Sequence, residues 1–397
     1  MLARLTGCHK NAGMSLFQKN STQPSTVVMS SLHFGFILTG IGTTLLGCIL
    51  PVLSVDWHLN DSSTGFLLAA QFAGSSCGAL WVRSHLYLTI LRGYALMIAG
   101  ALAIALSHGH IAPPLFFIFG LGMGSAMTAT SMLVARICSN TRAASLSWLN
   151  ASWGFGAVIC PIIVTLWERH RSAISFFWVM AFLISFSLLL LSLQYRYLSG
   201  FHDDLTSSQN LRAKLVLLIP FGIFAFLYVG VEASISSWMM TFVHRLHISS
   251  TFIAPIATSF FWIALLVGRT AAPAILKRIS ESRLLTISLS LVLVSNVLLL
   301  LSYTSAMNVT GAMLIGLMLA PIFPLCLSRV LAITSRPSES RWVFAVSGLG
   351  GAVLPWMTGQ VAAFGGSLRI GLLVPLLASG LMLFLHLRTM ALQENLS

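Results

Sequence analysis

Residues Leu215 to Val243 read LVLLIPFGIFAFLYVGVEASISSWMMTFV, an apolar run that carries one acidic residue, Glu232, near its middle. About 20 apolar residues at about 1.5 Å each span a hydrocarbon core of about 30 Å, so this carboxylate is expected to lie far from bulk water. A central acid costs roughly 2.5 to 3.5 kcal/mol on an insertion scale, and such residues usually face a bundle interior or a wet cavity. Glu232 is therefore a candidate solute or proton site. The alternative is a bond to a neighbouring helix or backbone group.

The composition of the whole chain is that of a membrane protein. Of its 397 residues, 57% are hydrophobic and 8% are charged, and the mean hydropathy is +0.90. A soluble domain carries about 25% charged residues, so most of this surface is expected to face lipid. The formal net charge of +13 comes from basic residues that stand singly between apolar runs. This placement follows the positive-inside rule and argues against a nucleic-acid partner.

Hydrophobic runs separated by short polar breaks predict an all-α polytopic membrane protein with twelve transmembrane helices. The expected spans are 27–53, 64–82, 88–106, 113–137, 144–166, 174–193, 215–243, 251–276, 284–303, 310–334, 341–364 and 370–386. The longest polar interruption falls at the midpoint. We therefore expect a disordered cytoplasmic tail (1–26), an N-terminal six-helix half (27–193), a cytoplasmic linker (194–214), a C-terminal six-helix half (215–388) and a C-terminal tail (389–397).

Basic residues also give the expected orientation. With the N-terminus inside, 18 of the 22 Lys and Arg residues fall on the cytoplasmic side, and Arg169, Arg171, Arg245 and Arg369 fall outside. This asymmetry predicts a multi-pass protein of the cell inner membrane with both termini cytoplasmic.

The two predicted halves repeat a pattern of glycine and proline. The pattern G-x-G-x4-P occurs at 154–161 and again 194 positions later at 348–355, and the same displacement relates Gly74 to Gly268. One offset between separate landmarks indicates duplication of a six-helix unit, so the two halves should be pseudo-symmetric. Parallel repeats of this kind place a solute site at their interface near the midplane, where one half can rock against the other.

Polar and aromatic residues within the spans are the candidate lining of a solute cavity, because pockets combine aromatic walls with a few placed polar groups. The candidates are Gln71, Asn150, Trp153, Tyr228, Glu232, Trp262, Phe323 and Trp356. Tyr228 lies one turn from Glu232 on the same helix face. Helix packing is the alternative for several of the aromatic side chains.

Two further groups of residues are candidates for coupling and gating. His33 is a second proton-coupling candidate beside Glu232, because imidazole titrates near neutral pH; a hydrogen-bonded core histidine is the alternative. Arg83 and Arg269, each at the predicted cytoplasmic end of a span, are candidates for a cytoplasmic gate, with topology alone as the alternative.

Enzyme chemistry is not indicated by the sequence. The six cysteines are spread over separate segments without metal or disulfide spacing, and the loop histidines are sparse, so no metal site or cofactor is expected. The chain shows no nucleophile beside a base and no pair of carboxylates. The expected partners are a small-molecule solute, protons and the lipid bilayer, and the protein is expected to be a monomer.

Several of these segments together resemble the major facilitator superfamily, and within it the fucose permease branch of sugar transporters, which are fucose/glucose/galactose:H+ symporters. The segments are Gly268-Arg269, Asn150 with GFGAVICP, YVGVEASISSW at 228–238, APIFP at 320–324 and GLGGAVLPW at 348–356. The resemblance implies alternating access and proton-coupled sugar uptake, with Asn150, Glu232 and Trp356 on matching motif positions.

The residues and the resemblance together predict secondary active transport of a small polar solute, with a sugar favoured and Glu232 as the coupling group. Two alternatives stay open. An exporter of amphipathic compounds or drugs is favoured by the Phe- and Met-rich spans, which carry few charges. A non-transporting membrane sensor is the other.

Overall fold

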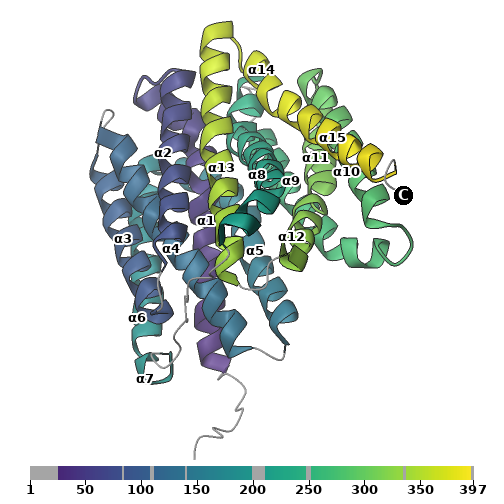
Figure 1. Cartoon of the computed structure of the whole chain (residues 1–397). Coiled ribbons are helices and arrows are strands. Elements are labelled where there is room, and N and C mark those ends of the chain that lie inside the picture. The colour runs from purple at the N-terminus through teal and green to yellow at the C-terminus, as the bar shows by residue number, and fades with distance from the viewer. Residues whose placement is uncertain are drawn as a thin grey trace, which may run out of the picture.

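The computed structural model describes residues 26–82, 85–107, 111–138, 141–198, 211–246, 252–333 and 337–394 as a bundle of helices (Figure 1). The predicted N-terminal tail, apart from its last residue, and most of the predicted linker lie outside these residues. No strand occurs in the described ranges.

The N-terminal half contains α1 (Thr26–Asp56), α2 (Asp61–Leu80), α3 (Leu86–Leu106), α4 (Ala112–Ile137), α5 (Arg142–Glu168), the 3-10 turn Ala173–Ser175, α6 (Phe176–Ser192) and α7 (Tyr195–Leu198). The C-terminal half contains α8 (Leu211–Leu246), α9 (Ile253–Ile275), α10 (Glu281–Leu300), α11 (Ser305–Leu319), α12 (Ile322–Ile333), α13 (Pro337–Gly365), α14 (Leu368–Gly371) and α15 (Leu373–Glu394). α11 and α12 form one span interrupted at Ala320-Pro321, and the prediction of twelve spans is confirmed.

The ends of the helices differ from the predicted spans where good helix formers continue past the apolar run. α8 begins at Leu211 instead of residue 215, and α15 reaches Glu394 instead of ending near residue 386. Arg, Ala, Lys, Leu and Gln at these positions all favour helix, so the helices extend beyond the length that a bilayer requires. The break in the tenth span has a local cause, because Pro321 lacks an N–H group and disfavours helix at Ala320.

Ten stretches in the described ranges are long and apolar enough to cross a membrane by length and composition, and α2 and α13 are the two spans that fall below that measure. Both are rich in glycine and polar residues. These two helices pack against each other across the halves, so much of their surface meets protein instead of lipid. Their lower hydropathy is therefore expected from their position.

The two halves use the same helix contacts. α1 packs on α5 and α2 on α4 in the N-terminal half, as α8 packs on α13 and α9 on α11 in the C-terminal half. The second glycine of each repeat lies at these contacts: a Cβ at Gly156 would clash with the carbonyl oxygen of Ile37 in α1, and one at Gly350 would clash with that of Phe226 in α8. The glycine repeat therefore marks equivalent close approaches of helix backbones.

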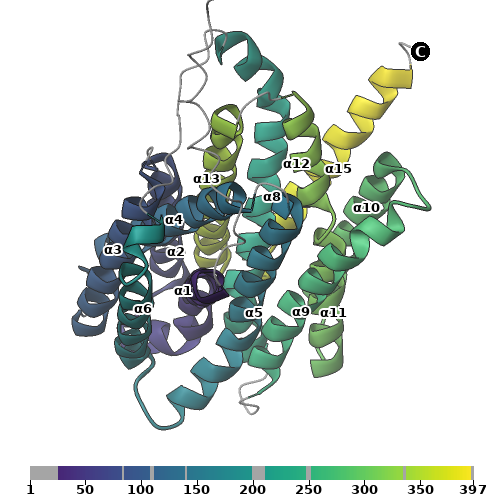
Figure 2. The same ribbon diagram turned by 90° about the horizontal axis from the view of Figure 1, so that it is seen from below.

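The halves meet through α2 with α13, α5 with α9 and α1 with α8. α5 and α9 run side by side in Figure 2. We call the end of the bundle where α1 ends and α2 begins the Asp61 end. There Arg245 of α8 donates to both carboxylate oxygens of Asp61, at 2.9 and 2.5 Å. Beside it the Ser62 hydroxyl donates to Oε1 of Gln360 in α13, at 2.9 Å.

The contacts between α5 and α9 run along α5 from Arg169 to Trp153. Near the Asp61 end, the Arg169 guanidinium lies 4.4 Å from the centre of the Phe252 ring, and further along Ser259 donates to the Val158 carbonyl oxygen at 2.9 Å. Asn150 lies two turns beyond Val158 on the same face of α5, and it is exposed. The halves are thus joined at the Asp61 end, and Asn150 is exposed.

The glycine contacts predict which Gly→Ala substitutions the bundle tolerates. We expect Gly350→Ala to lower the thermal stability of the purified protein, because the new methyl group would force α13 away from α8. Gly380→Ala in α15 is the matched control, since its Cβ would lie 3.7 Å from Leu293 and alanine favours helix by up to about 1 kcal/mol. Equal melting temperatures for the two variants in detergent would contradict the proposed role of the repeat.

Candidate solute site

Glu232 lies in an ion pair near the middle of α8. The Nη2 atom of Arg269, on α9, lies 3.1 Å from Oε2 of Glu232. The Tyr228 hydroxyl donates to the same carboxylate oxygen, and Nη2 of Arg269 lies 3.3 Å from the Tyr228 hydroxyl oxygen. The side chains of Glu232 and Arg269 are 14% and 25% exposed, whereas Tyr228 is buried. The charge of the Glu232 carboxylate is thus compensated by Arg269, and the carboxylate is still partly exposed.

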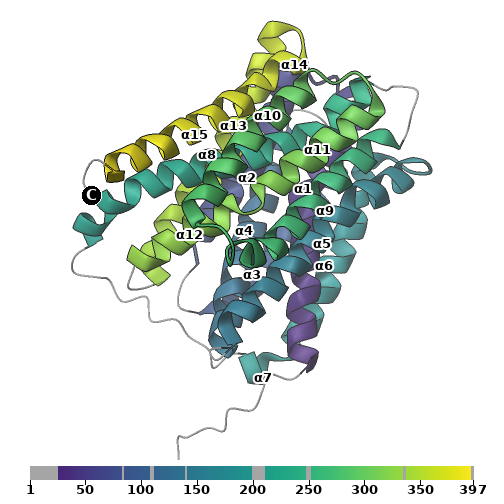
Figure 3. The same cartoon turned by 90° about the vertical axis from the view of Figure 1, so that its right-hand side faces the viewer.

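Local sequence explains this geometry. Tyr228 and Glu232 are one turn apart on one face of α8. On α9, Gly268 lets the helix approach the interrupted span, since a Cβ there would lie 2.5 Å from the Ala320 side chain. Beyond the interruption α12 lies beside α8 (Figure 3), and the Phe323 ring stacks on Tyr228 with centroids 5.4 Å apart. The glycine and the proline break therefore help to place Arg269 beside Glu232 and Phe323 on Tyr228.

Both members of the ion pair belong to the C-terminal half. The bond to a neighbouring helix, which the sequence left open for Glu232, is present. For Arg269 the described contacts are with Glu232 and Tyr228 and not with the N-terminal half. Its role in a gate between the halves stays a prediction, and Arg83 lies outside the described residues.

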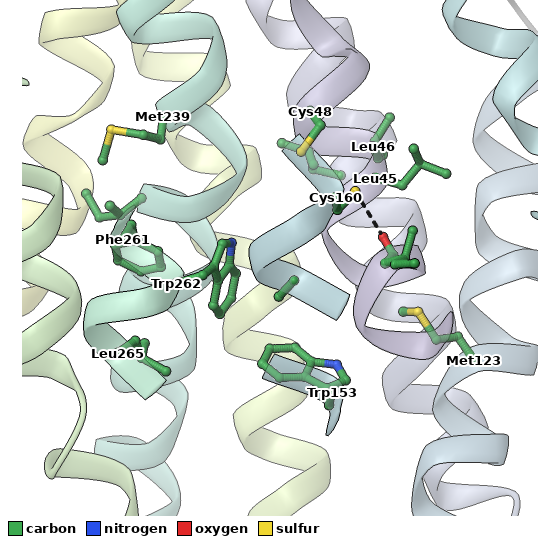
Figure 4. Close-up of a cluster of buried hydrophobic side chains, with 14 of the residues drawn as sticks. Leu45, Leu46, Cys48, Met123, Trp153, Cys160, Met239, Phe261, Trp262 and Leu265 are labelled. Atoms are coloured by element: carbon green, nitrogen blue, oxygen red, sulfur yellow. Dashed lines mark hydrogen bonds between the residues drawn. The ribbon is translucent and has the colours of Figure 1, made fainter. Parts of the chain in front are cut away.

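Trp153 of α5 and Trp262 of α9 face each other across the halves (Figure 4). Their rings meet edge to face, with centroids 5.2 Å apart and an interplanar angle of 82°. The indole N–H of Trp153 donates to the Thr43 hydroxyl at 3.4 Å. Trp262 is 3% exposed, and its Nε1 is buried without an acceptor among the described residues, as is Nε of Arg269. A buried donor without a partner costs about 1–3 kcal/mol, so both call for an explanation.

The other predicted site residues make separate contacts. Gln71 is buried and donates to the Gly42 carbonyl oxygen at 3.1 Å. Asn150 donates to its own helix, and His33 Nδ1 lies 2.7 Å from the Ser152 hydroxyl. Trp356 is 38% exposed on α13. The structure therefore gathers Tyr228, Glu232, Phe323 and Arg269 in one cluster and Trp153 with Trp262 in another. Gln71 is connected to the second cluster, because it also donates to the carbonyl oxygen of Thr43 at 3.4 Å. Asn150, His33 and Trp356 make no described hydrogen bond or ring contact to either cluster.

Thr43 contacts the tryptophan pair, and the sequence did not indicate this. It accepts from Trp153 and donates to the Thr39 carbonyl oxygen at 2.8 Å. Thr39 and Thr44 make similar bonds to their own helix, so nothing in the pattern of α1 distinguishes Thr43 from its neighbours.

The ion pair predicts a non-additive effect on stability. Glu232→Gln leaves the Arg269 charge without its partner, and breaking a buried pair costs up to about 3–5 kcal/mol, less where the pair is partly exposed. We expect the double variant Glu232→Gln/Arg269→Gln to melt at a higher temperature than either single variant. Glu281→Gln is the control, because its carboxylate lies 3.8 Å from Arg329 and is 52% exposed. Additive losses would contradict coupling between the two residues.

The family model of the Major Facilitator Superfamily matches residues 32–355. The glucose/mannose transporter GlcP of Bacillus subtilis (strain 168) is 24% identical over 347 residues, 82% of this chain and 85% of that protein. The bypass of stop codon protein 6 of Saccharomyces cerevisiae (strain ATCC 204508 / S288c) is 20% identical over 376 residues, 82% of this chain and 75% of that protein.

Solved transporters share the fold. A POT family transporter in complex with 5-aminolevulinic acid superposes with a TM-score of 0.76 at 12% identity, over 93% of this chain and 96% of that one. A mutant of the nucleoside transporter NupG gives 0.72 at 16%, over 92% and 98%. The family match covers most of the chain, and its members are membrane transporters of small molecules and not enzymes. The chain belongs to the major facilitator superfamily.

Proposed function

We propose that this transporter carries a small polar solute, a sugar, by secondary active transport, and that Glu232 couples the solute to protons. The main support is the partly exposed ion pair of Glu232 and Arg269, in which the Tyr228 hydroxyl also donates to Glu232. Sugar hydroxyls both donate and accept hydrogen bonds, and this cluster offers both kinds of partner. The 24% identity to a glucose/mannose transporter supports the same solute class.

Protonation of Glu232 would change what Arg269 can bind. When the Glu232 carboxylate is ionised, it accepts a hydrogen bond from Nη2 of Arg269 and pairs with the guanidinium. A protonated Glu232 no longer attracts Arg269 as an ion, so both side chains become available to solute oxygens. Solute and proton would then bind together, which is the requirement for symport. His33, hydrogen-bonded to Ser152 in the N-terminal half, is the second proton-coupling candidate.

Alternating access would move the halves, 27–193 and 215–388, against each other. The contacts of Asp61 with Arg245 and of Ser62 with Gln360 close the Asp61 end. By the distribution of basic residues we place this end outside, with both termini cytoplasmic in the inner membrane. The exposed Asn150 then lies toward the cytoplasm.

We also propose that the protein acts as a monomer.

The proposal is tested by uptake of labelled hexoses and deoxyhexoses into proteoliposomes, with and without an inward proton gradient. We expect the proton gradient to drive uptake by the wild type. Glu232→Gln should lose this uptake, because a glutamine amide cannot take up and release a proton as a carboxyl group does. Glu281→Gln, which removes an exposed carboxylate of the same half, should keep uptake. Equal uptake by Glu232→Gln and wild type would refute the coupling role, and no movement of any sugar would point to another solute class, such as exported amphipathic compounds.

Alternating access predicts a second result at the Asp61 end. A short bifunctional thiol reagent applied to Asp61→Cys/Arg245→Cys should link α2 to α8 and stop transport, because the halves could no longer part there. Each single cysteine variant, treated in the same way, serves as the control. Full transport by a fully cross-linked double variant would exclude opening at this end.

A further inference from the structure

The two indoles between the halves are chemically identical but differ in their hydrogen bonds. Thr43 already accepts from Trp153. Trp262 is at least as well buried as its neighbour, and its N–H group has no acceptor among the described residues. Nearly all buried donors in folded proteins have a partner, and an indole nitrogen can donate but not accept. The missing partner of Trp262 must therefore be an acceptor.

A second unpartnered donor lies on the same helix face. Nε of Arg269 is buried and has no acceptor in the part of the chain that the structure describes, while Nη2 of the same guanidinium contacts Glu232. Residues 262 and 269 are two turns apart and lie on one face of α9. On that face Trp262 contacts Trp153 of the N-terminal half, and Arg269 contacts Glu232 of α8. Two unmatched donors between the Trp pair and the carboxylate fit a solute that presents several acceptor oxygens.

We propose that Trp262 determines solute specificity, and that its indole N–H and Nε of Arg269 bind two acceptor oxygens of the transported solute. This inference rests on the proposed function and deepens it. The acceptors are hydroxyl oxygens of a neutral sugar or carboxylate oxygens of a sugar acid. Trp153 covers Trp262 while α5 lies against α9, and rocking of the halves uncovers the indole N–H for the solute.

Trp262→Phe and Trp153→Phe form a matched pair for the test. Each keeps an aromatic ring and removes one indole N–H group. We expect Trp262→Phe to raise KM for the transported hexose about five- to tenfold with kcat little changed, since one neutral hydrogen bond is lost. Both variants lose the same ring volume, so Trp262→Phe should melt above Trp153→Phe, because only Trp153→Phe also loses a hydrogen bond, the bond to Thr43.

A deoxyhexose series identifies the oxygen that Trp262 binds. One deoxy position should raise KM for the wild type and for Trp153→Phe but not for Trp262→Phe, because in that variant the donor is already gone. An unchanged KM in Trp262→Phe would overturn the inference and leave the proposed function intact. Equal losses in KM and melting temperature for both variants would also overturn it, since they would show a packing role.

Thermal shifts of the purified protein separate this inference from the proposed function. The panel contains neutral hexoses and the hexuronates glucuronate and galacturonate. If the wild type transports no hexose but hexuronates raise its melting temperature and not that of Trp262→Phe, the neutral-sugar proposal fails and the donor role of Trp262 stands with a carboxylate as the acceptor. If no sugar or sugar acid shifts the wild type, both proposals fail.

Discussion

An ionised carboxylate can lie among transmembrane helices only if another group compensates its charge, and Arg269 does this for Glu232. The local architecture of the C-terminal half follows from this requirement. Gly268 brings α9 close to the interrupted tenth span, and the interruption after Ala320 places Phe323 on Tyr228. The pair is partly exposed, as the proposed exchange of Arg269 between Glu232 and a solute would require.

The duplicated sequence explains the scaffold, while the site breaks the duplication. Gly156 and Gly350 make equivalent backbone contacts in the two halves, so the repeat preserves helix packing. The ion pair of Glu232 and Arg269 belongs to the C-terminal half, and the His33–Ser152 hydrogen bond belongs to the N-terminal half. The two candidate coupling groups therefore differ in kind, with an ion pair in one half and a histidine–serine hydrogen bond in the other.

Much of the fold and part of the site could be predicted from the sequence. Lipid requires long apolar helices, so the spans were visible, and Tyr228 and Glu232 are joined by helical spacing alone. The partner of Glu232 was not visible, because pairing with Arg269 depends on how α8 and α9 pack. For the same reason Gln71 could be recognised as a buried amide, but not as one whose donor bonds the Gly42 carbonyl of α1.

Buried donors decide how the two halves can part. At the Asp61 end the ion pair with Arg245 is partly exposed, so water could replace it at small cost if the end opens as proposed. Between α5 and α9 the situation differs, because Trp153 and Trp262 meet edge to face and the N–H group of Trp262 has no acceptor among the described residues. Under the proposed alternating access, separation of the two indoles would break no hydrogen bond of Trp262 and would give its N–H group access to an acceptor. Ser259 would lose its bond to the Val158 carbonyl oxygen, so a new bond at Trp262 would offset that loss and favour opening coupled to solute binding.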